Sequence, residues 1–247
     1  MDRKTLYTFQ RWSAYSGFLV MIVVGICFFS FAKVQPPLSP TESPEWIKDF
    51  LIDNKTGIMW SIVLISLVVP LEYLFVVTTS WQMRRIEGGW GPLSMIQVLT
   101  GVVAPIGFMY PLFVLATAAY RPEERSPEIL SVLVDLFFFM YVGFALVFVL
   151  QVFVIGWAVL LDKRENPVFP RWFAYINFLL GVVLAPGCLI FLVKDGPLAW
   201  NGLFAFWLPS IAYLVWKIST PLLLLKAAKS EFEESEENVT KVDPSMA

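Results

Sequence analysis

Residues 66–81, SLVVPLEYLFVVTTSW, place an ionisable residue, Glu72, in the middle of an otherwise apolar run. On insertion scales a charge at the centre of a membrane helix costs about 2.5 to 3.5 kcal/mol, so such a residue is expected to face the interior of a helix bundle and to have a partner there. This stretch therefore predicts a membrane-spanning helix that contributes a charged group to a buried site.

The composition of the whole chain indicates a membrane protein. Of its 247 residues, 57% are hydrophobic and 15% are charged, and the mean hydropathy is +0.69. Soluble domains contain about 25% charged residues, so the chain falls in the class of polytopic membrane proteins. The net charge is −2 and acidic residues gather near the C-terminus, so no basic patch exists for nucleic acid. Nucleic acid is therefore excluded as a partner.

Metal and cofactor chemistry is not expected from the residues available. The chain has no histidine and two cysteines, Cys27 and Cys188, each inside an apolar run. Transition-metal and haem sites depend on imidazole or on clustered thiolates. The two cysteines are expected to be packed thiols, and we predict neither a metal site nor a cofactor.

Six segments are apolar and long enough to cross a hydrocarbon core, which takes about 20 helical residues. They cover residues 14–32, 57–79, 94–120, 129–161, 170–193 and 198–225. The fourth segment exceeds the length that a straight span needs, so it must bend, tilt or protrude, and Gly143 and Gly156 are the candidate bends.

The distribution of lysine and arginine predicts the orientation of the bundle. These residues are more numerous in the loops that share a side with the N-terminus, and such loops are cytoplasmic by the positive-inside rule. The fold class expected is an all-α polytopic membrane helix bundle with six transmembrane helices, N-in/C-in. Its parts are a cytoplasmic segment 1–13, a transmembrane domain 14–225 with an extracytoplasmic loop 33–56, and a disordered acidic cytoplasmic tail 226–247.

Glu72 has one obvious partner, Lys217. Glu72 lies about four residues past the centre of the second span, roughly 6 Å to the cytoplasmic side of the midplane, and Lys217 lies roughly 7.5 Å to the same side in the sixth. Pro70, two residues before Glu72, favours a local kink beside the charge. We predict that Glu72 and Lys217 meet inside the bundle and form the catalytic pair of any reaction.

Further polar side chains fall at comparable depth in the neighbouring spans. The amides are Gln97, Gln151 and Asn177, and hydroxyls come from Tyr73 and Tyr213. One interpretation is that this layer is an interhelical network that only holds the helices together. The other is that it lines a cavity and binds a ligand, the default hypothesis for ionisable groups within a membrane.

A second and thinner polar set lies toward the outer face. Asp135 enters six residues into the fourth span and Asn201 lies at the start of the sixth at similar height. Both are candidate ligand-binding residues. The simpler interpretation of Asp135 is an interfacial acid that is paired with a loop arginine, Arg121 or Arg125.

Three stretches suggest a relationship: KDGPLAWNGLFAFWLPSIAYLVWK (194–217), QMRRIEGGWGPLSMIQ (82–97) and NPVFPRWFAYINF (166–178). The chain resembles a group of small bacterial six-span integral membrane proteins with no assigned activity. The resemblance covers most of the chain and implies a multi-pass protein of the cell membrane, the bacterial inner membrane. It brings no catalytic motif.

These observations favour a protein that handles a hydrophobic small molecule or lipid in an intramembrane pocket. One form is a metal-independent isomerase or cyclase with Glu72 as the acid or base. The alternatives are a transporter or small-molecule permease and an accessory subunit of a membrane complex. A pocket that opens sideways to lipid favours the first, two vestibules favour transport, and a packed interior favours the accessory role. The partners expected are the lipid bilayer and a hydrophobic molecule or lipid, and a homo-oligomer is compatible with the sequence.

Overall fold

The computed structural model of the protein describes residues 2–144 and 146–242. The protein is 81% helical, and the described residues contain no strand. The elements in chain order are α1 (Arg3–Ile26), η1 (Cys27–Phe31), α2 (Pro44–Val68), η2 (Val69–Leu71), α3 (Glu72–Glu87), α4 (Pro92–Tyr120), α5 (Pro127–Gly143), α6 (Leu146–Leu161), α7 (Arg171–Leu184), η3 (Ala185–Phe191), η4 (Leu203–Trp207) and α8 (Leu208–Val242). Six helical segments are long and apolar enough to cross a membrane, which confirms the predicted six-helix bundle.

Local sequence explains where the second span begins and ends. The Ser43 side chain accepts a hydrogen bond from the backbone N–H of Trp46 at 3.2 Å, and Pro44 occupies the first helical position, where its missing N–H costs nothing. Gly88 ends α3 in the left-handed conformation with φ of 74°. Since α2 begins at Pro44, the first turns of this helix lie within the stretch 33–56 that the sequence assigns to a loop.

The helices are interrupted at Pro70 and within the long fourth span, where the sequence predicts a kink and a bend. Pro70 lies in η2, the single 3-10 turn that separates α2 from α3 and makes Glu72 the first residue of α3. The long fourth span is divided between α5, which ends at Gly143, and α6. A Cβ on Gly143 would lie 2.5 Å from Cζ of Phe191, so glycine permits this close packing. Gly156, the other candidate bend, lies inside the continuous helix α6.

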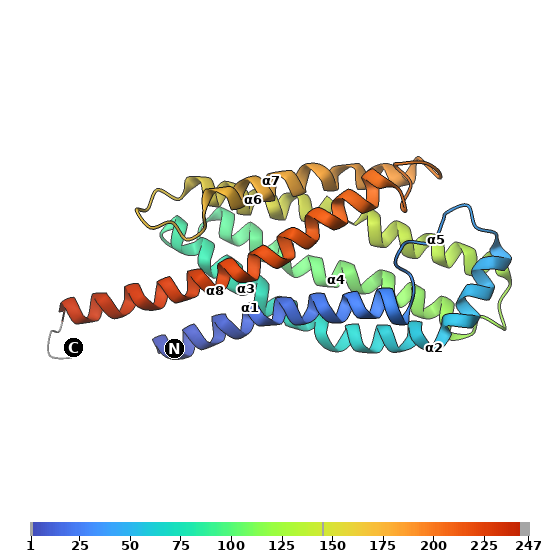
Figure 1. Ribbon diagram of the computed structural model, residues 1–247, viewed down its shortest axis with the longest axis horizontal. Coiled ribbons are helices and arrows are strands. Elements are labelled where there is room, and N and C mark those ends of the chain that lie inside the picture. Colours follow the sequence, from blue (N-terminus) through green and yellow to red (C-terminus); the bar gives the residue numbers. More distant parts are fainter. Residues whose placement is uncertain (1, 145, 243–247) are drawn as a thin grey trace.

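Both ends of the chain lie at the same end of the bundle, as six spans require (Figure 1). Helices α1 and α8 pack against each other near this end and separate toward the opposite end, where α8 leans toward α7 (Figure 1). The N-in/C-in orientation stays a prediction.

The interior consists of two apolar clusters. The first joins η1, α2, α4 and α5 toward the end opposite the termini, and the second joins α3, α6, α7 and α8 nearer the termini. Fully buried members of the first include Ile58, Leu115 and Phe138, and those of the second include Met83, Ile155, Phe173 and Leu224. Because lipid is as apolar as these side chains, close packing rather than water exclusion holds the helices together.

The C-terminal part of the chain differs from the expected disordered tail 226–247. In the structure, α8 continues without a break to Val242, and residues 243–247 lie outside the described part. Arg85 of α3 forms an ion pair with Glu234 at 2.8 Å, and Arg3 of α1 donates to the backbone oxygen of Ser235 at 2.6 Å. The prediction of disorder is wrong for residues 226–242, because the acidic residues that suggested it bind groups on α1 and α3.

A buried polar cluster, Gln10, Trp81, Gln82 and Glu231, fixes this extension to the bundle. The Glu231 carboxylate accepts hydrogen bonds from Nε2 of Gln10 and of Gln82, both at 2.9 Å, and from Nε1 of Trp81 at 3.1 Å. Gln82 also donates to Oε1 of Gln10. Since Gln10 and Gln82 are almost fully buried, this cluster joins α1, α3 and α8 through charge-assisted hydrogen bonds.

Candidate functional site

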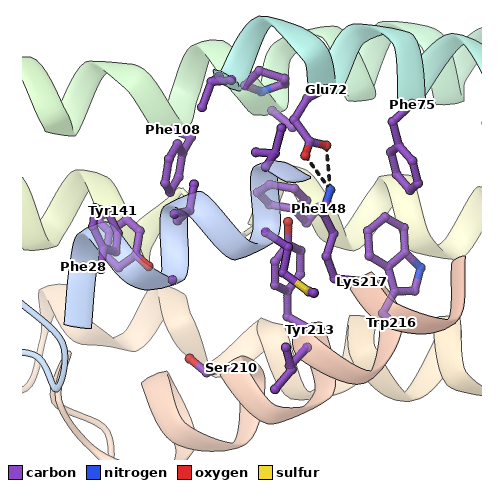
Figure 2. A pocket seen from close by; sticks show the side chains of 18 of the residues that line it. Phe28, Glu72, Phe75, Phe108, Tyr141, Phe148, Ser210, Tyr213, Trp216 and Lys217 are labelled. Carbon is purple, nitrogen blue, oxygen red and sulfur yellow. Dashed lines mark hydrogen bonds and ion pairs between the residues drawn. The ribbon is translucent and has the colours of Figure 1, made fainter. Parts of the chain in front are cut away.

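The predicted meeting of Glu72 and Lys217 is confirmed. The Lys217 Nζ lies 2.7 Å from Oε1 and 2.6 Å from Oε2 of Glu72, so the ammonium bridges both carboxylate oxygens (Figure 2). The Lys217 side chain is 4% exposed and that of Glu72 is 15% exposed. Pro70 contributes to this arrangement because the η2 turn places Glu72 at the start of α3, facing α8.

Glu72 takes two of the three N–H groups of Lys217 in this arrangement. An ammonium carries three donors. Two are directed to the carboxylate oxygens of Glu72, and Nζ also lies 4.4 Å from the centroid of the Phe75 ring, a cation–π contact. Glu72, in contrast, keeps acceptor capacity because an ionised carboxylate has about four lone-pair sites.

The ion pair forms part of the wall of a cavity between the two apolar clusters. Its volume is about 400 Å³, within the range of about 300 to 1,000 Å³ that is typical of small-molecule sites. A smaller cavity of about 150 Å³ shares part of the same wall. Figure 2 shows Phe75 and Trp216 on one side of the ion pair and Phe28, Phe108 and Tyr141 on the other. The wall is contributed by α1, η1, η2, α3, α4, α5, α6, η4 and α8 and by the segment that follows η1.

The cavity opens sideways, between α1 and α8. Four of the residues that line it are exposed on the surface: Phe29 of η1, Trp207 of η4, and Ile211 and Leu214 of α8. The element η1 continues α1, and η4 leads directly into α8, the two helices that separate toward this end of the bundle in Figure 1. The opening therefore faces the surroundings of the spans, where a membrane would place its lipid chains.

Few polar groups other than the ion pair line the cavity. Gln151 is buried, and its Oε1 has no hydrogen-bond partner within the described residues. At another point of the wall, Nε2 of Gln35 donates to the hydroxyl of Tyr141 at 3.2 Å. The hydroxyls of Ser210 and Tyr213 complete the polar lining. A site of this kind suits a mostly apolar ligand with one or two polar groups.

The structure brings some of the predicted layer together and separates the rest. Gln151 and Tyr213 line the cavity with the ion pair, whereas Tyr73 and Gln97 do not. Gln97 is buried, and neither atom of its amide has a hydrogen-bond partner in the described part of the chain. Their functional roles stay predictions.

Asn177 supports the cavity wall from behind. Its Nδ2 donates to the backbone oxygen of Phe173 at 2.7 Å, and its Oδ1 accepts from Nε1 of Trp216 at 2.9 Å. Trp216 lines the cavity and stacks on the ring of Tyr213, with centroids 5.8 Å apart. Asn177 therefore fixes a wall residue and does not itself line the cavity.

The outer polar pair lies away from the cavity. Neither Asp135 on α5 nor Asn201 in the turn before η4 lines it. The expected pairing of Asp135 with an arginine is wrong, because Arg121 pairs with Glu124 at 3.5 Å and Arg125 donates to the backbone oxygen of Thr117. Both arginines are used within their own loop and the end of α4.

Sequence reasoning missed most of the wall. Phe28, Phe75 and Phe108 gave no signal, because aromatic residues occur at every register of these spans and only the packing selects the inward ones. Gln35 lies in the segment after η1, and its contact with Tyr141 joins residues 106 positions apart. Pairings at such sequence distances leave no local pattern.

The described residues contain no group of three or more acidic or cysteine side chains that is placed to hold a metal ion. The polar and aromatic groups that line the cavity are an ion pair, amides, hydroxyls and aromatic rings. No protein-family model, curated protein or solved structure matches this chain.

Proposed function

We propose that this protein binds a hydrophobic small molecule or lipid that enters from the bilayer through the gap between α1 and α8. The single observation that carries the proposal is the apolar cavity of about 400 Å³ whose exposed lining residues all lie at that gap. An apolar molecule in the bilayer would reach the cavity without crossing water.

The Glu72–Lys217 pair gives the cavity a polar end. A buried ion pair alone is weak evidence for function, because replacing both charges with apolar residues often leaves stability unchanged or improves it. Here the pair lies on the wall of an open cavity rather than in a packed interior, and the Glu72 side chain keeps 15% of its surface accessible. This accessibility favours contact with a ligand over a purely structural role.

The shape of the cavity also favours binding over the alternatives. An accessory subunit needs no internal cavity, and a transporter needs openings on two opposite faces. The cavity wall reaches the surface at one lateral gap, flanked by Phe29 on one side and by Trp207, Ile211 and Leu214 on the other. A lateral opening suits a molecule that is taken from the membrane and returned to it.

Acid–base catalysis on the bound molecule is a second candidate, favoured by the position of Glu72 in the wall. An isomerase needs one carboxylate that accepts a proton from carbon and returns it to another carbon, with no co-reactant. Phe75, Tyr213 and Trp216 surround the pair, and aromatic faces stabilise positive charge that develops on a substrate. Under this proposal the variant Glu72→Gln retains the ligand and loses turnover.

The proposal is tested by filling the cavity. Gly25 lines it, and a Cβ on this residue would meet no atom within 4 Å, so Gly25→Leu starts a side chain from open space at the cavity. Organic extracts of the purified wild type and of Gly25→Leu are compared by mass spectrometry, with Gly25→Ala as the matched control. We expect a hydrophobic molecule in the wild type and in Gly25→Ala, and at least about a tenfold depletion in Gly25→Leu.

Thermal melting of the three proteins verifies that each is folded. Identical extracts from folded wild type and folded Gly25→Leu would contradict the proposal, because a filled cavity must release its occupant. A lower melting temperature of Gly25→Leu with an unchanged amount of bound molecule would also contradict the proposal. If Gly25→Ala lost the molecule as well, the change in α1, and not the lost cavity volume, would be what displaces it.

The subcellular localisation of the protein is part of the same proposal. We place the protein in the bacterial inner membrane as a multi-pass protein, on the resemblance of residues 82–97, 166–178 and 194–217 to small bacterial membrane proteins. The six apolar helices support a membrane environment of some kind.

A further inference from the structure

We infer that the molecule in the cavity is a neutral lipid that carries a hydroxyl group, and that this hydroxyl donates a hydrogen bond to Glu72. The inference rests on the proposed function and specifies the class of ligand. It follows from the charge balance of the wall and from which hydrogen-bonding groups of the wall are already used.

The charge balance requires a neutral ligand. Glu72 and Lys217 are the charged residues among those that line the cavity, and they neutralise each other at 2.6 Å. A fatty acid or a phospholipid phosphate would add a negative charge beside the Glu72 carboxylate without a free cation to compensate it. In a low-dielectric interior an uncompensated charge is strongly unfavourable, so an anionic ligand is rejected.

The Glu72 carboxylate favours a donor on the ligand. Its two oxygens accept from Lys217, which uses two of the three donors of the ammonium, and the charge of the ammonium also faces the ring of Phe75. The carboxylate still has free lone pairs and an accessible surface. Because an ionised carboxylate can only accept hydrogen bonds, it binds a ligand group that donates one.

Gln151 reinforces this acceptor character. It lines the same cavity, and its Oε1 is a buried acceptor without a partner in the residues that the structure describes. Buried acceptors of this kind are rare in folded proteins and gain most from the arrival of a donor. An alcohol has a single O–H donor, which Glu72 takes here, and its oxygen can still accept a hydrogen bond from a hydroxyl of the wall, where Ser210 and Tyr213 lie.

The test uses three matched probes on the purified full-length protein: dibrominated stearyl alcohol, its methyl ether and dibrominated stearic acid. Bromine quenches tryptophan fluorescence on contact, and Trp207 and Trp216 line the cavity. The ether keeps the shape and removes the donor, and the acid adds a charge at neutral pH. We expect the alcohol to bind about tenfold more tightly than either of the others.

Two variants locate the effect. Gly25→Leu is expected to weaken quenching by all three probes, which shows that they bind in the cavity. The double change Glu72→Leu with Lys217→Leu removes both charges together and leaves no charge unpaired. In this variant the alcohol is expected to lose its advantage over the ether.

Each outcome has a distinct meaning. If the ether or the acid binds the wild type as tightly as the alcohol, in a manner that Gly25→Leu abolishes, the ligand class is wrong and the proposed function stands. If quenching by all three probes is the same in the wild type and in Gly25→Leu, the alcohol is not an occupant of the cavity and the inference fails. The extracts of the Gly25 variants then decide the proposed function separately.

Discussion

At the scale of single residues, Glu72 and Lys217 form a buried ion pair in the wall of the cavity. A charge inside a bundle is tolerated only with a partner, and here each charge has one at 2.6 Å. The two residues are therefore strongly coupled: the presence of each makes the other acceptable. This coupling is measurable because variants that lack one charge can be compared with a variant that lacks both, in which no buried charge is left without a partner.

We expect either single change, Glu72→Gln or Lys217→Met, to lower the free energy of unfolding by about 3 to 5 kcal/mol, because each leaves the partner buried and uncompensated. The double variant is expected to lose much less than the sum of the single losses. Denaturation in detergent, followed by tryptophan fluorescence, measures all three. Additive losses would show that the two side chains do not interact.

Asp162 is a second acid whose surroundings decide its charge, and it lies just outside the fourth span. Its side chain is 1% exposed and accepts hydrogen bonds from Arg164 at 2.8 Å and 2.9 Å and from the backbone N–H of Val168 at 2.8 Å. Burial by itself would raise the pKa of Asp162, but these hydrogen bonds and the guanidinium hold the pKa below its ordinary value of 3.8. The ionised acid thereby fixes the turn between α6 and α7.

The lowered pKa of Asp162 predicts a pH dependence of stability. The stabilisation is complete above pH 3.8 and is lost as the pH falls through the lower pKa of the folded state. We expect Asp162→Asn to reduce the free energy of unfolding by about 1 to 3 kcal/mol at neutral pH. Melting temperatures recorded from pH 7 downward should converge with those of the wild type at acidic pH. The exposed acid Asp195 supplies the control, since Asp195→Asn should melt like the wild type at every pH.

At the scale of elements, the contact between the end of α1 and the start of the second span depends on small residues. Gly57 and Ser61 lie four positions apart on α2, the spacing that lets membrane helices approach closely. Ser61 donates to the backbone oxygen of Cys27 at 3.0 Å, and a Cβ on Gly57 would overlap the backbone oxygen of Phe31. The π-helical turn η1 is held against α2 at these two points.

Gly57→Ala is therefore expected to destabilise the protein by about 1 to 3 kcal/mol, because backbone atoms cannot move aside as a side chain can. Gly25→Ala is the matched control, because it changes a glycine of α1 where a Cβ meets no atom within 4 Å. Thermal melting of the two variants measures the difference. Equal melting temperatures would show that η1 and α2 are not in close contact at Gly57.

Helix α8 is the other element whose extent depends on particular contacts. Residues after 225 are rich in acids, and their helix is anchored by Glu231 to Gln10, Trp81 and Gln82. The stacking of Phe232 on Tyr7, with centroids 4.9 Å apart, adds an apolar contact next to this cluster.

Replacing Glu231 should weaken the attachment of the last part of α8 to α1 and α3. Glu231→Leu removes the shared acceptor of Gln10, Trp81 and Gln82, so we expect a loss of about 1 to 3 kcal/mol in the free energy of unfolding and faster amide exchange after residue 225. Glu233→Leu is the control, because the 57% exposed Glu233 forms only a surface pair with Lys229 at 3.6 Å. If both variants exchange like the wild type, the polar cluster does not hold the helix in place.

At the scale of the whole molecule, the cavity follows from the way the helices diverge. Helices α1 and α8 are held together near the termini and separate toward the other end, so the two apolar clusters do not close completely over the middle of the bundle (Figure 1). The remaining space is lined by residues of both clusters, such as Phe28 of the first and Trp216 of the second.

The orientation of the molecule is a prediction at this scale. An even number of spans places both termini on one side, and the excess of lysine and arginine in the loops on that side predicts the cytoplasm. A C-terminal green fluorescent protein fusion should be fluorescent in bacterial cells, and a C-terminal alkaline phosphatase fusion should be inactive. Active phosphatase would reverse the orientation and leave the fold unchanged.

The six helices, the break at Pro70 and the pairing of Glu72 with Lys217 could all be predicted from the amino-acid sequence. These features follow from local or nearly local physics: the free energy of placing apolar runs in lipid, the missing N–H of proline, and the need of a buried charge for a partner at its own depth. The depth of a residue in the membrane follows from its position along a helix, so two residues 145 positions apart could be matched from the sequence.

Three-dimensional packing was needed to show that a cavity exists, which aromatic residues line it and that Asn177 supports Trp216 from outside the cavity. It also decided that residues 226–242 are helical, because the sequence shows their charges but not the buried donors that bind them. The physical reason is the same in each case. Packing depends on how far α1 separates from α8 and on how each helix is rotated, and neither quantity leaves a periodic trace in a span that is apolar on every face.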